Sequence, residues 1–245
     1  MERPLERPLE RRASIRTAVV WEAVSALLDG AEGQRVLDIG GGTGGFAVRV
    51  AELGHRVTVV DPSPDALAAL DRRARERQVE NRIVGQQGDL AGLDELVEEG
   101  SVDLVLCHEV LGLVDDAEAA LATIGRVLRP GGRLSLLVSQ RHAAVLARAM
   151  AGHFTQARDL LDGPVDGAGA GERRFTAEEL EELLAATGFT VSDVHGIRVF
   201  ADLVPSTLLD LEPGAIGGLI DLERAVAGRP EYRTTAAQLH VLASH

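Results

Sequence analysis

Lysine is absent from this chain of 245 residues, in which all 25 basic side chains are arginine. Schiff-base chemistry and a lysine general base are therefore excluded, because both need an amine that can lose its proton. The same absence removes any phosphate-binding loop that ends in Gly-Lys-Ser or Gly-Lys-Thr. A nucleotide hydrolase of the Walker type is excluded.

Cysteine and long apolar runs are also scarce. The one cysteine, Cys107, allows neither an internal disulfide nor a site of several thiolates, which favours a reducing compartment, and we expect no metal. No apolar run approaches the ~20 residues that span a membrane, and residues 1–12 carry charges where a signal peptide needs an apolar core. We expect a cytoplasmic protein with no membrane partner.

Basic charge is in the minority. The 38 carboxylates outnumber the arginines and give a formal net charge of −13. Such a field repels polyanions, so a nucleic-acid partner would need a local basic patch.

Short apolar runs alternate with helix-like runs as far as about residue 140. Strands are predicted near 35–39, 56–60, 82–87, 102–107 and 133–138, and helices near 17–28, 45–53, 64–78, 91–98 and 117–128. The strand runs show no clean alternation, as expected where helices cover both faces of a parallel sheet. The pattern predicts a doubly wound α/β fold, with a single domain over 17–245 and a flexible arm over 1–16.

The regular alternation of strand-like and helix-like runs stops after Ser139. Residues 140–171 predict one or two amphipathic helices and a glycine-rich loop, and Thr176 with Glu179 forms a capping-box pattern that begins another helix. A long strand over 189–203, a second insertion over 201–233 and a last strand over 236–244 follow. We expect the insertions at 140–171 and 201–233 to form a cap over the site.

The stretch VLDIGGGTGGFAVRV joins the first strand to the next helix. Gly40, Gly42 and Gly44 follow Asp38 in a D-x-G-x-G-x-G arrangement, where glycine lets the chain turn sharply and a ligand lie on bare backbone. Gly40, Gly42 and Gly45 also satisfy the G-x-G-x-x-G of dinucleotide enzymes. The stretch alone leaves both interpretations open.

Carboxylates at or just after the ends of the first three strands favour a different ligand from a dinucleotide. Asp38 would repel a pyrophosphate but suits a cationic amino group. Asp61, seventeen residues after Gly44, is placed to accept both hydroxyls of a ribose. Asp89 could accept a hydrogen bond from an adenine amine while Leu90 packs on the ring. A Pro-Gly-Gly turn at 130–132 follows in order.

Together these features, over about residues 35–138, resemble the class I methyltransferases that use S-adenosyl-L-methionine and release S-adenosyl-L-homocysteine. The resemblance implies a Rossmann-like, mostly parallel seven-stranded sheet with the last strand antiparallel and with helical cap insertions. It also implies a set of cofactor-binding residues: Asp38, Gly40, Gly41, Gly42, Gly44, Asp61, Pro62, Asp89 and Leu90.

Further segments resemble the bacterial tRNA 5-carboxymethoxyuridine methyltransferases: SIRTAVVWEAV, CHEVLGLV, MAGHF, GIRVFADL and LERAVAGRPEYRTTAAQLHVLAS. This resemblance implies that Arg16 and His108 lie around the cofactor. It implies methylation of a carboxylate on a wobble uridine in tRNA, giving a methyl ester. A carboxylate is already ionised at pH 7, so such a site needs a positioning cation rather than a base.

Three candidates for catalytic residues each have a structural alternative. Arg198 could clamp the substrate's carboxylate in a bidentate pair, or only cap the sheet edge or pair with Asp202. Tyr232 could line the substrate pocket or serve as a buried aromatic anchor. Glu109, after the fourth strand, could act at the site or be a solvated or helix-capping carboxylate. For Cys107 we expect a buried hydrophobe.

Two alternatives remain for the function. A small-molecule metabolite is the alternative substrate, because DLLDGPVDGAGAGERRF lacks a lysine-rich run and aromatic residues make up 3% of the chain. A nicotinamide-dependent oxidoreductase on the same fold is the alternative of another class. The arginines expected around the pocket could still hold an anion: Arg16, Arg141, Arg173, Arg174 and Arg198.

Overall fold

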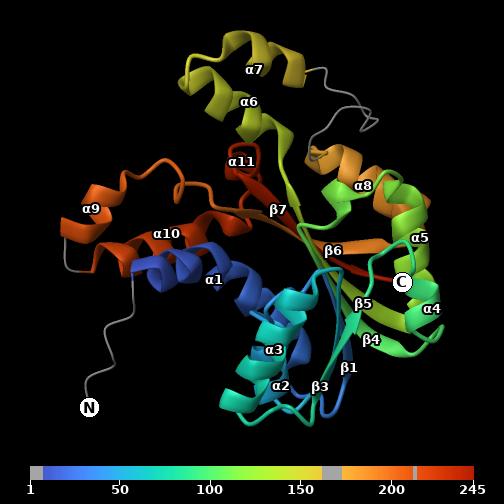
Figure 1. Ribbon diagram of the computed structural model, residues 1–245. Coiled ribbons are helices and arrows are strands. Elements are labelled where there is room, and N and C mark those ends of the chain that lie inside the picture. Colours follow the sequence, from blue (N-terminus) through green and yellow to red (C-terminus); the bar gives the residue numbers. More distant parts are fainter. Residues whose placement is uncertain (1–7, 162–172, 212–213) are drawn as a thin grey trace.

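A seven-stranded sheet with helices on both faces forms the body of the molecule (Figure 1), for which a computed structural model describes residues 8–161, 173–211 and 214–245. The strands are β1 (Arg35–Ile39), β2 (Arg56–Asp61), β3 (Ile83–Gln87), β4 (Val102–His108), β5 (Leu128–Ser139), β6 (Thr190–Ile197) and β7 (Gln238–Ser244). Their order across the sheet is β3-β2-β1-β4-β5-β7-β6, and β7 runs antiparallel to both of its neighbours. The mostly parallel sheet with an antiparallel last strand is confirmed.

The helices follow the alternation that the sequence predicts through β5. They are α1 (Pro8–Leu28), α2 (Ala47–Glu52), α3 (Pro64–Glu76), α4 (Leu93–Leu96), the 3-10 turn η1 (Leu111–Leu113), α5 (Ala117–Val127), α6 (Arg141–Met150), α7 (Phe154–Leu161), α8 (Ala177–Ala186), α9 (Ser206–Leu211), α10 (Ala215–Ala227) and α11 (Pro230–Arg233). The predicted capping box at Thr176 and Glu179 begins α8, with both of its hydrogen bonds present.

Two apolar layers hold the sheet. Val105 and Cys107 of β4 face α4, α5 and α8, whereas Leu104 and Leu106 face α1, α2, α3 and α10. The sheet is therefore buried on both faces, which explains why its strands read as continuous apolar runs. Cys107 is fully buried, and burial raises the pKa of its thiol to about 12, so it serves as a core residue.

Some element boundaries differ from the sequence-based expectation. α1 begins at Pro8 rather than near Thr17, because proline at the first helical position loses no hydrogen bond. β6 ends at Ile197 rather than near residue 203, because Arg198 adopts a left-handed backbone with φ of 59°. Residues 1–7 of the predicted arm and the glycine-rich stretch 162–171 lie outside the described residues.

Helical insertions gather beyond the carboxyl ends of the parallel strands. Figure 1 shows α6 and α7 as a hairpin that points away from the sheet, while α10 lies beside α1. An ion pair between Arg224 of α10 and Glu22 of α1 links these two helices. In the described ranges no helix is long and apolar enough to cross a membrane.

Candidate cofactor site

The turn after β1 contacts the carboxylates of Asp38 and Asp61. A Cβ added to Gly41 would come within 2.5 Å of Asp38 Oδ2, so only glycine lets the backbone pass this close. Gly42 has a φ of 55°, and a Cβ there would meet nothing nearer than Asp61 Oδ2 at 3.8 Å. The backbone of the turn thus packs against Asp38 at Gly41 and leaves open space at Gly42. A ligand would lie against this open side.

Gly44 and Gly45 distinguish the two motifs that the sequence leaves open. Gly44 has a φ of 80°, and a Cβ there would lie 2.3 Å from Leu70 Cδ1. At Gly45 an added Cβ would meet nothing within 4 Å. The third glycine of the dinucleotide motif serves close helix-to-strand packing, which this chain does not require at Gly45. The geometry favours the D-x-G-x-G-x-G arrangement.

Replacing Gly44 with alanine is expected to lower the free energy of unfolding by about 2–4 kcal/mol, from left-handed strain and overlap with Leu70. The melting temperature should fall by roughly 5–15 °C. Gly45→Ala is the matched control, with an expected change within about 0.5 kcal/mol. Equal melting temperatures for the two variants would contradict this account of the turn.

Asp38 is a buried carboxylate with an unpaired oxygen. Asp38 is 3% exposed, and its Oδ2 has no hydrogen-bond partner among the described residues. Burial raises its pKa to about 7, the nearby charge of Asp61 adds to the rise, and a hydrogen bond from the backbone of Ala47 lowers it. A buried oxygen without a donor is rare in native proteins, so the site fits a cationic ligand group that would pair with it.

Asp61 closes the second side of the site at the end of β2. Its Oδ2 accepts a hydrogen bond from Gly42 N at 2.9 Å, and its Oδ1 accepts one from Ser63 N at 2.9 Å. Each carboxylate oxygen has two lone pairs, so both can still accept from vicinal hydroxyls. Asp61 thereby ties the glycine turn to β2 while keeping acceptor capacity.

The residues predicted to meet an adenine differ in exposure. Asp89 lies after β3 and caps the next turn, where its Oδ1 accepts from Gly92 N at 3.1 Å. Leu90 is buried in the core with Leu93, so little of its side chain is available to a ring. Pro62 is exposed beside Asp61. Arg16 lies within α1, and its side chain is not described.

His108 belongs to a chain of hydrogen-bonded polar groups that the sequence patterns do not predict. Its Nε2 lies 2.9 Å from Ser135 Oγ, which lies 2.8 Å from His240 Nε2, and His195 stacks on His240 with ring centroids 5.6 Å apart. Because a hydroxyl has one hydrogen, Ser135 donates to one ring and accepts from the other. The sequence signal is a polar residue inside an apolar strand run, as at Ser135 and His240.

Burial keeps these rings neutral. It lowers the pKa of His108 to about 4 and holds the pKa of His240 well below its usual value. His108 also packs edge-on against Phe46, with ring centroids 4.8 Å apart. His108 therefore contributes a neutral polar ring beside the glycine turn.

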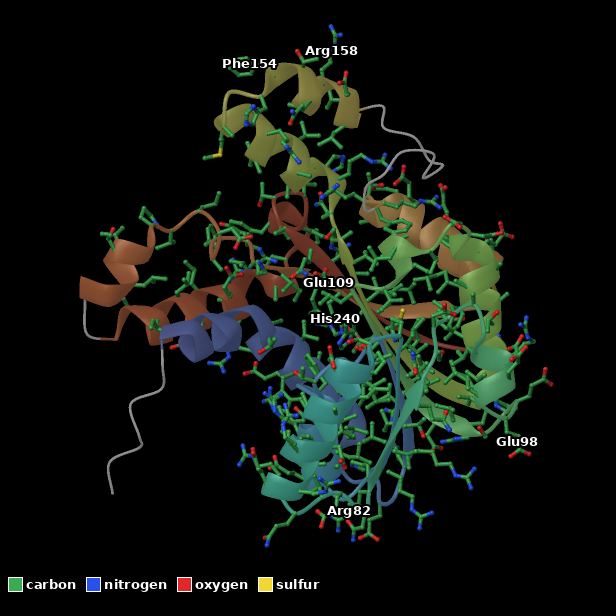
Figure 2. All side chains as sticks on the ribbon, viewed as in Figure 1. Arg82, Glu98, Glu109, Phe154, Arg158 and His240 are labelled. Atoms are coloured by element: carbon green, nitrogen blue, oxygen red, sulfur yellow. The ribbon has the colours of Figure 1, made fainter. Side chains whose placement is uncertain are left out.

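Glu109 and Arg198 share an unusual backbone. Glu109 has a φ of 63° and Arg198 a φ of 59°, in a region that L side chains rarely adopt. Strain of this kind costs about 1–3 kcal/mol at each residue and concentrates at functional sites. Figure 2 shows Glu109 near the middle of the molecule, between the sheet and the α6–α7 hairpin, with Arg82 at the opposite end of the sheet.

The three candidate catalytic side chains have partners within the chain. Glu109 Oε1 accepts from Gln238 Nε2 at 2.5 Å. Arg198 forms a two-pronged ion pair with Asp202, which is the alternative that the sequence left open for it. Tyr232 is partly exposed and meets Phe200 edge-on at 5.9 Å between centroids, so it is not a fully buried anchor.

Two of the other arginines expected around the pocket have partners within the chain. Arg141 makes a bidentate pair with Glu179 at 2.7 and 2.8 Å, and the guanidinium of Arg173 lies over Phe175 at 5.0 Å. A cavity of about 580 Å³ opens next to Arg173 between the start of α5 and α8. Of the arginines expected around the pocket only Arg173 lines this acidic cavity, and none of the predicted cofactor-binding or catalytic residues does, so the cavity is separate from the cofactor site.

Comparison with known proteins points to one enzyme class. Residues 37–136 match the family model described as a methyltransferase domain. The tRNA 5-carboxymethoxyuridine methyltransferase of Escherichia coli K12 is 28% identical over 235 residues, which cover 95% of this chain and 88% of the relative. The ubiquinone biosynthesis O-methyltransferase of Xanthomonas oryzae pv. oryzae is 39% identical over 142 residues, 57% of each chain.

A solved structure reproduces the fold. The magnesium protoporphyrin IX methyltransferase of Synechocystis, determined with bound S-adenosylhomocysteine, superposes with a TM-score of 0.64 at 17% identity. The match covers 100% of this chain and 90% of that one.

Proposed function

We propose that this S-adenosylmethionine-dependent methyltransferase methylates a carboxylate oxygen, and that the carboxylate belongs to a modified wobble uridine of tRNA. The comparisons support methyl transfer from S-adenosyl-L-methionine, and the proposal concerns the group that accepts the methyl. It is supported by the similarity to the E. coli tRNA enzyme over 95% of the chain and by a strained arginine, Arg198, at the edge of the sheet. The nicotinamide alternative is set aside, because the methyltransferase-domain match and the open space at Gly45 both oppose it.

The described residues fit this cofactor. The unpaired Oδ2 of Asp38 would take the cationic amino group, and the free lone pairs of Asp61 would take the ribose hydroxyls. Gly40, Gly41, Gly42 and Gly44 would supply bare backbone, with Pro62, Asp89 and His108 around it. Arg16 is assigned to the cofactor by the family resemblance alone. When bound, S-adenosylmethionine supplies an electrophilic methyl group on a sulfonium sulfur.

Cofactor affinity should depend on pH through Asp38. Burial raises the pKa of this carboxyl to about 7, and a cationic amine pairs only with its ionised form. We therefore expect S-adenosylhomocysteine to bind more tightly as the pH rises from about 5.5 to about 8. The free protein should lose the stability that protonated Asp38 contributes over the same range, because the unfolded carboxyl is already ionised there.

Thermal melts with and without S-adenosylhomocysteine measure this effect. The ligand-induced rise in melting temperature should grow with pH in the wild type and stay flat in Asp38→Asn, whose side chain does not titrate. A ligand-induced rise that is independent of pH in the wild type would contradict the pairing.

The two-pronged pairing of Arg198 with a carboxylate is the observation that supports a carboxylate as the methyl acceptor. The planar guanidinium of Arg198 binds carboxylates in a two-pronged geometry, and it already holds one carboxylate, that of Asp202. A carboxylate acceptor is ionised at neutral pH, so the site needs orientation rather than proton removal. Glu109 and Tyr232 would then border the acceptor rather than activate it.

A transfer assay tests the proposal. Labelled S-adenosylmethionine is incubated with the enzyme and with tRNA from cells that lack the methyl ester, and tRNA-bound label is counted before and after mild alkali. Label that enters the tRNA and is released by alkali is expected, because methyl esters hydrolyse under these conditions. Alkali-stable label, or none, overturns the assignment, and Asp61→Ala serves as the inactive control.

A small-molecule acceptor is the second candidate. The net charge of −13, the absence of lysine and the 39% identity to a ubiquinone biosynthesis O-methyltransferase favour it. A hydroxyl acceptor has to lose a proton, and Glu109 would be the carboxylate that takes it. Loss of activity in Glu109→Gln with a hydroxyl substrate, alongside no transfer to tRNA, would favour this candidate.

Two further assignments belong to the same proposal. The insertions at 140–171 and 201–233 would form the cap that selects the substrate, on a domain that spans 17–245. The enzyme would work in the cytoplasm, where tRNA is modified and where a lone buried thiol such as Cys107 stays reduced.

A further inference from the structure

The loop after β6 binds two carboxylates of its own chain. Glu223 of α10 accepts three backbone N–H groups from this loop, and Asp202 pairs with Arg198 at its start. The two carboxylates differ in burial, because Glu223 is 2% exposed whereas the side chain of Asp202 is 36% exposed.

Glu223 fixes the course of the loop. Its Oε2 accepts from Val199 N at 2.9 Å, and its Oε1 accepts from Phe200 N at 2.8 Å and from Ala201 N at 2.7 Å. Three N–H groups converge on one carboxylate immediately after Arg198, whose left-handed backbone needs support from its surroundings. The same loop presents Phe200 to Tyr232. Losing Glu223 would leave one buried and two partly buried N–H donors unpaired, so this contact stays in place.

The Arg198–Asp202 pair is easier to break. Nε of Arg198 donates to Oδ1 of Asp202 at 3.3 Å, and an Nη atom donates to Oδ2. The arginine side chain is 21% exposed, so water can solvate the partners when they separate. Another carboxylate that reaches Arg198 would restore the same two charged hydrogen bonds, so its exchange for Asp202 costs little net interaction energy.

We propose that Asp202 is an internal competitor that occupies Arg198 until the substrate's carboxylate displaces it, while Glu223 positions the loop throughout. Asp202 then sets the affinity for the acceptor, and Glu223 acts through Arg198 as a positioning residue. The inference rests on the proposed carboxylate acceptor and names the residues that tune its recognition.

The first test replaces Asp202 with asparagine, which keeps the shape and removes the charge. The KM for the tRNA substrate is expected to fall about three- to fivefold, with kcat and the Kd of S-adenosylhomocysteine unchanged. Asp71→Asn is the matched control, because Asp71 forms an exposed pair with Arg75 at the same four-residue spacing. An unchanged or raised KM in Asp202→Asn overturns the competitor role.

The second test asks whether Glu223 acts through Arg198. Glu223→Gln turns one acceptor oxygen into a donor that faces backbone N–H groups, and the KM is expected to rise about tenfold with cofactor binding intact. The double variant with Arg198→Ala should be no worse than Arg198→Ala alone. Independent, multiplying losses would show that Glu223 does not act through Arg198. Melting curves of each variant identify any that are unfolded at the assay temperature, and Glu223→Asp then replaces Glu223→Gln in the cycle.

A readout without tRNA separates this inference from the proposed function. The NMR signal of Arg198 Nε–H is followed in the full chain as sodium acetate is added. Saturation at several-fold lower acetate in Asp202→Asn than in the wild type is expected, and identical titrations overturn the inference. If acetate displaces Asp202 but tRNA receives no methyl group, the tRNA assignment fails while the exchange at Arg198 stands.

Discussion

Replacing Asp61 with alanine is expected to weaken S-adenosylhomocysteine binding about 100-fold, the largest loss of cofactor affinity from one substitution. The carboxylate accepts hydrogen bonds from Gly42 and Ser63, so its removal both frees the glycine turn and removes the acceptors proposed for the ribose. Hydrogen bonds to a charged group contribute about 1.5–3 kcal/mol each, and a loss of about 3 kcal/mol corresponds to this factor. Titration calorimetry measures it.

Asp71→Ala is the control for this prediction. Asp71 is an exposed residue of α3, and among the described residues its ion-pair partner is Arg75. Its loss should therefore leave the Kd within about twofold. Circular dichroism establishes that both variants are folded. An Asp61→Ala protein that is folded and binds the ligand as tightly as the wild type would show that this carboxylate is not part of the site.

Arg198→Ala is expected to lower kcat/KM for the carboxylate substrate about 100-fold, mainly through KM, while the Kd of S-adenosylhomocysteine stays unchanged. Two charged hydrogen bonds to the acceptor are lost, together about 3 kcal/mol. Arg198→Lys should recover little, since an ammonium group cannot reproduce the planar fork. Steady-state kinetics with tRNA as the varied substrate measures both constants.

Arg75→Ala provides the matching control for the loss of an arginine, because Arg75 forms an exposed ion pair on α3. Its kinetics should equal those of the wild type. Should Arg198→Ala instead lower kcat at constant KM, the arginine would act in the transfer step and not in holding the acceptor.

The sheet and the carboxylate turn were predictable because both leave local signals. A strand buried on both faces reads as a continuous apolar run, and Asp38 lies next to the last residue of β1 while Asp61 ends β2. The need for glycine at position 44 rather than 45 was not predictable, because it depends on Leu70 of α3. Sequence spacing alone satisfies both motifs.

The loop after β6 was predicted wrongly as a continuation of the strand. The run GIRVF has β-forming residues, but Glu223, more than twenty positions later, captures its backbone N–H groups and ends the strand. A long-range contact of this kind overrides local propensity. The partners of His108 were missed for the same reason, because Ser135 and His240 meet only through the order of β4, β5 and β7.

The hydroxyl of Ser135 on β5 makes the proton positions of two histidine rings interdependent, one on β4 and one on β7. If a ligand donates a hydrogen bond to Nδ1 of His108, that ring must carry its proton on Nε2 and donate it to Ser135. Ser135 must then donate to Nε2 of His240, which places the proton of that ring on Nδ1. The tautomer adopted at β4 thus fixes the opposite tautomer at β7, and a polar contact beside the glycine turn changes the proton position on a ring that is itself fully buried.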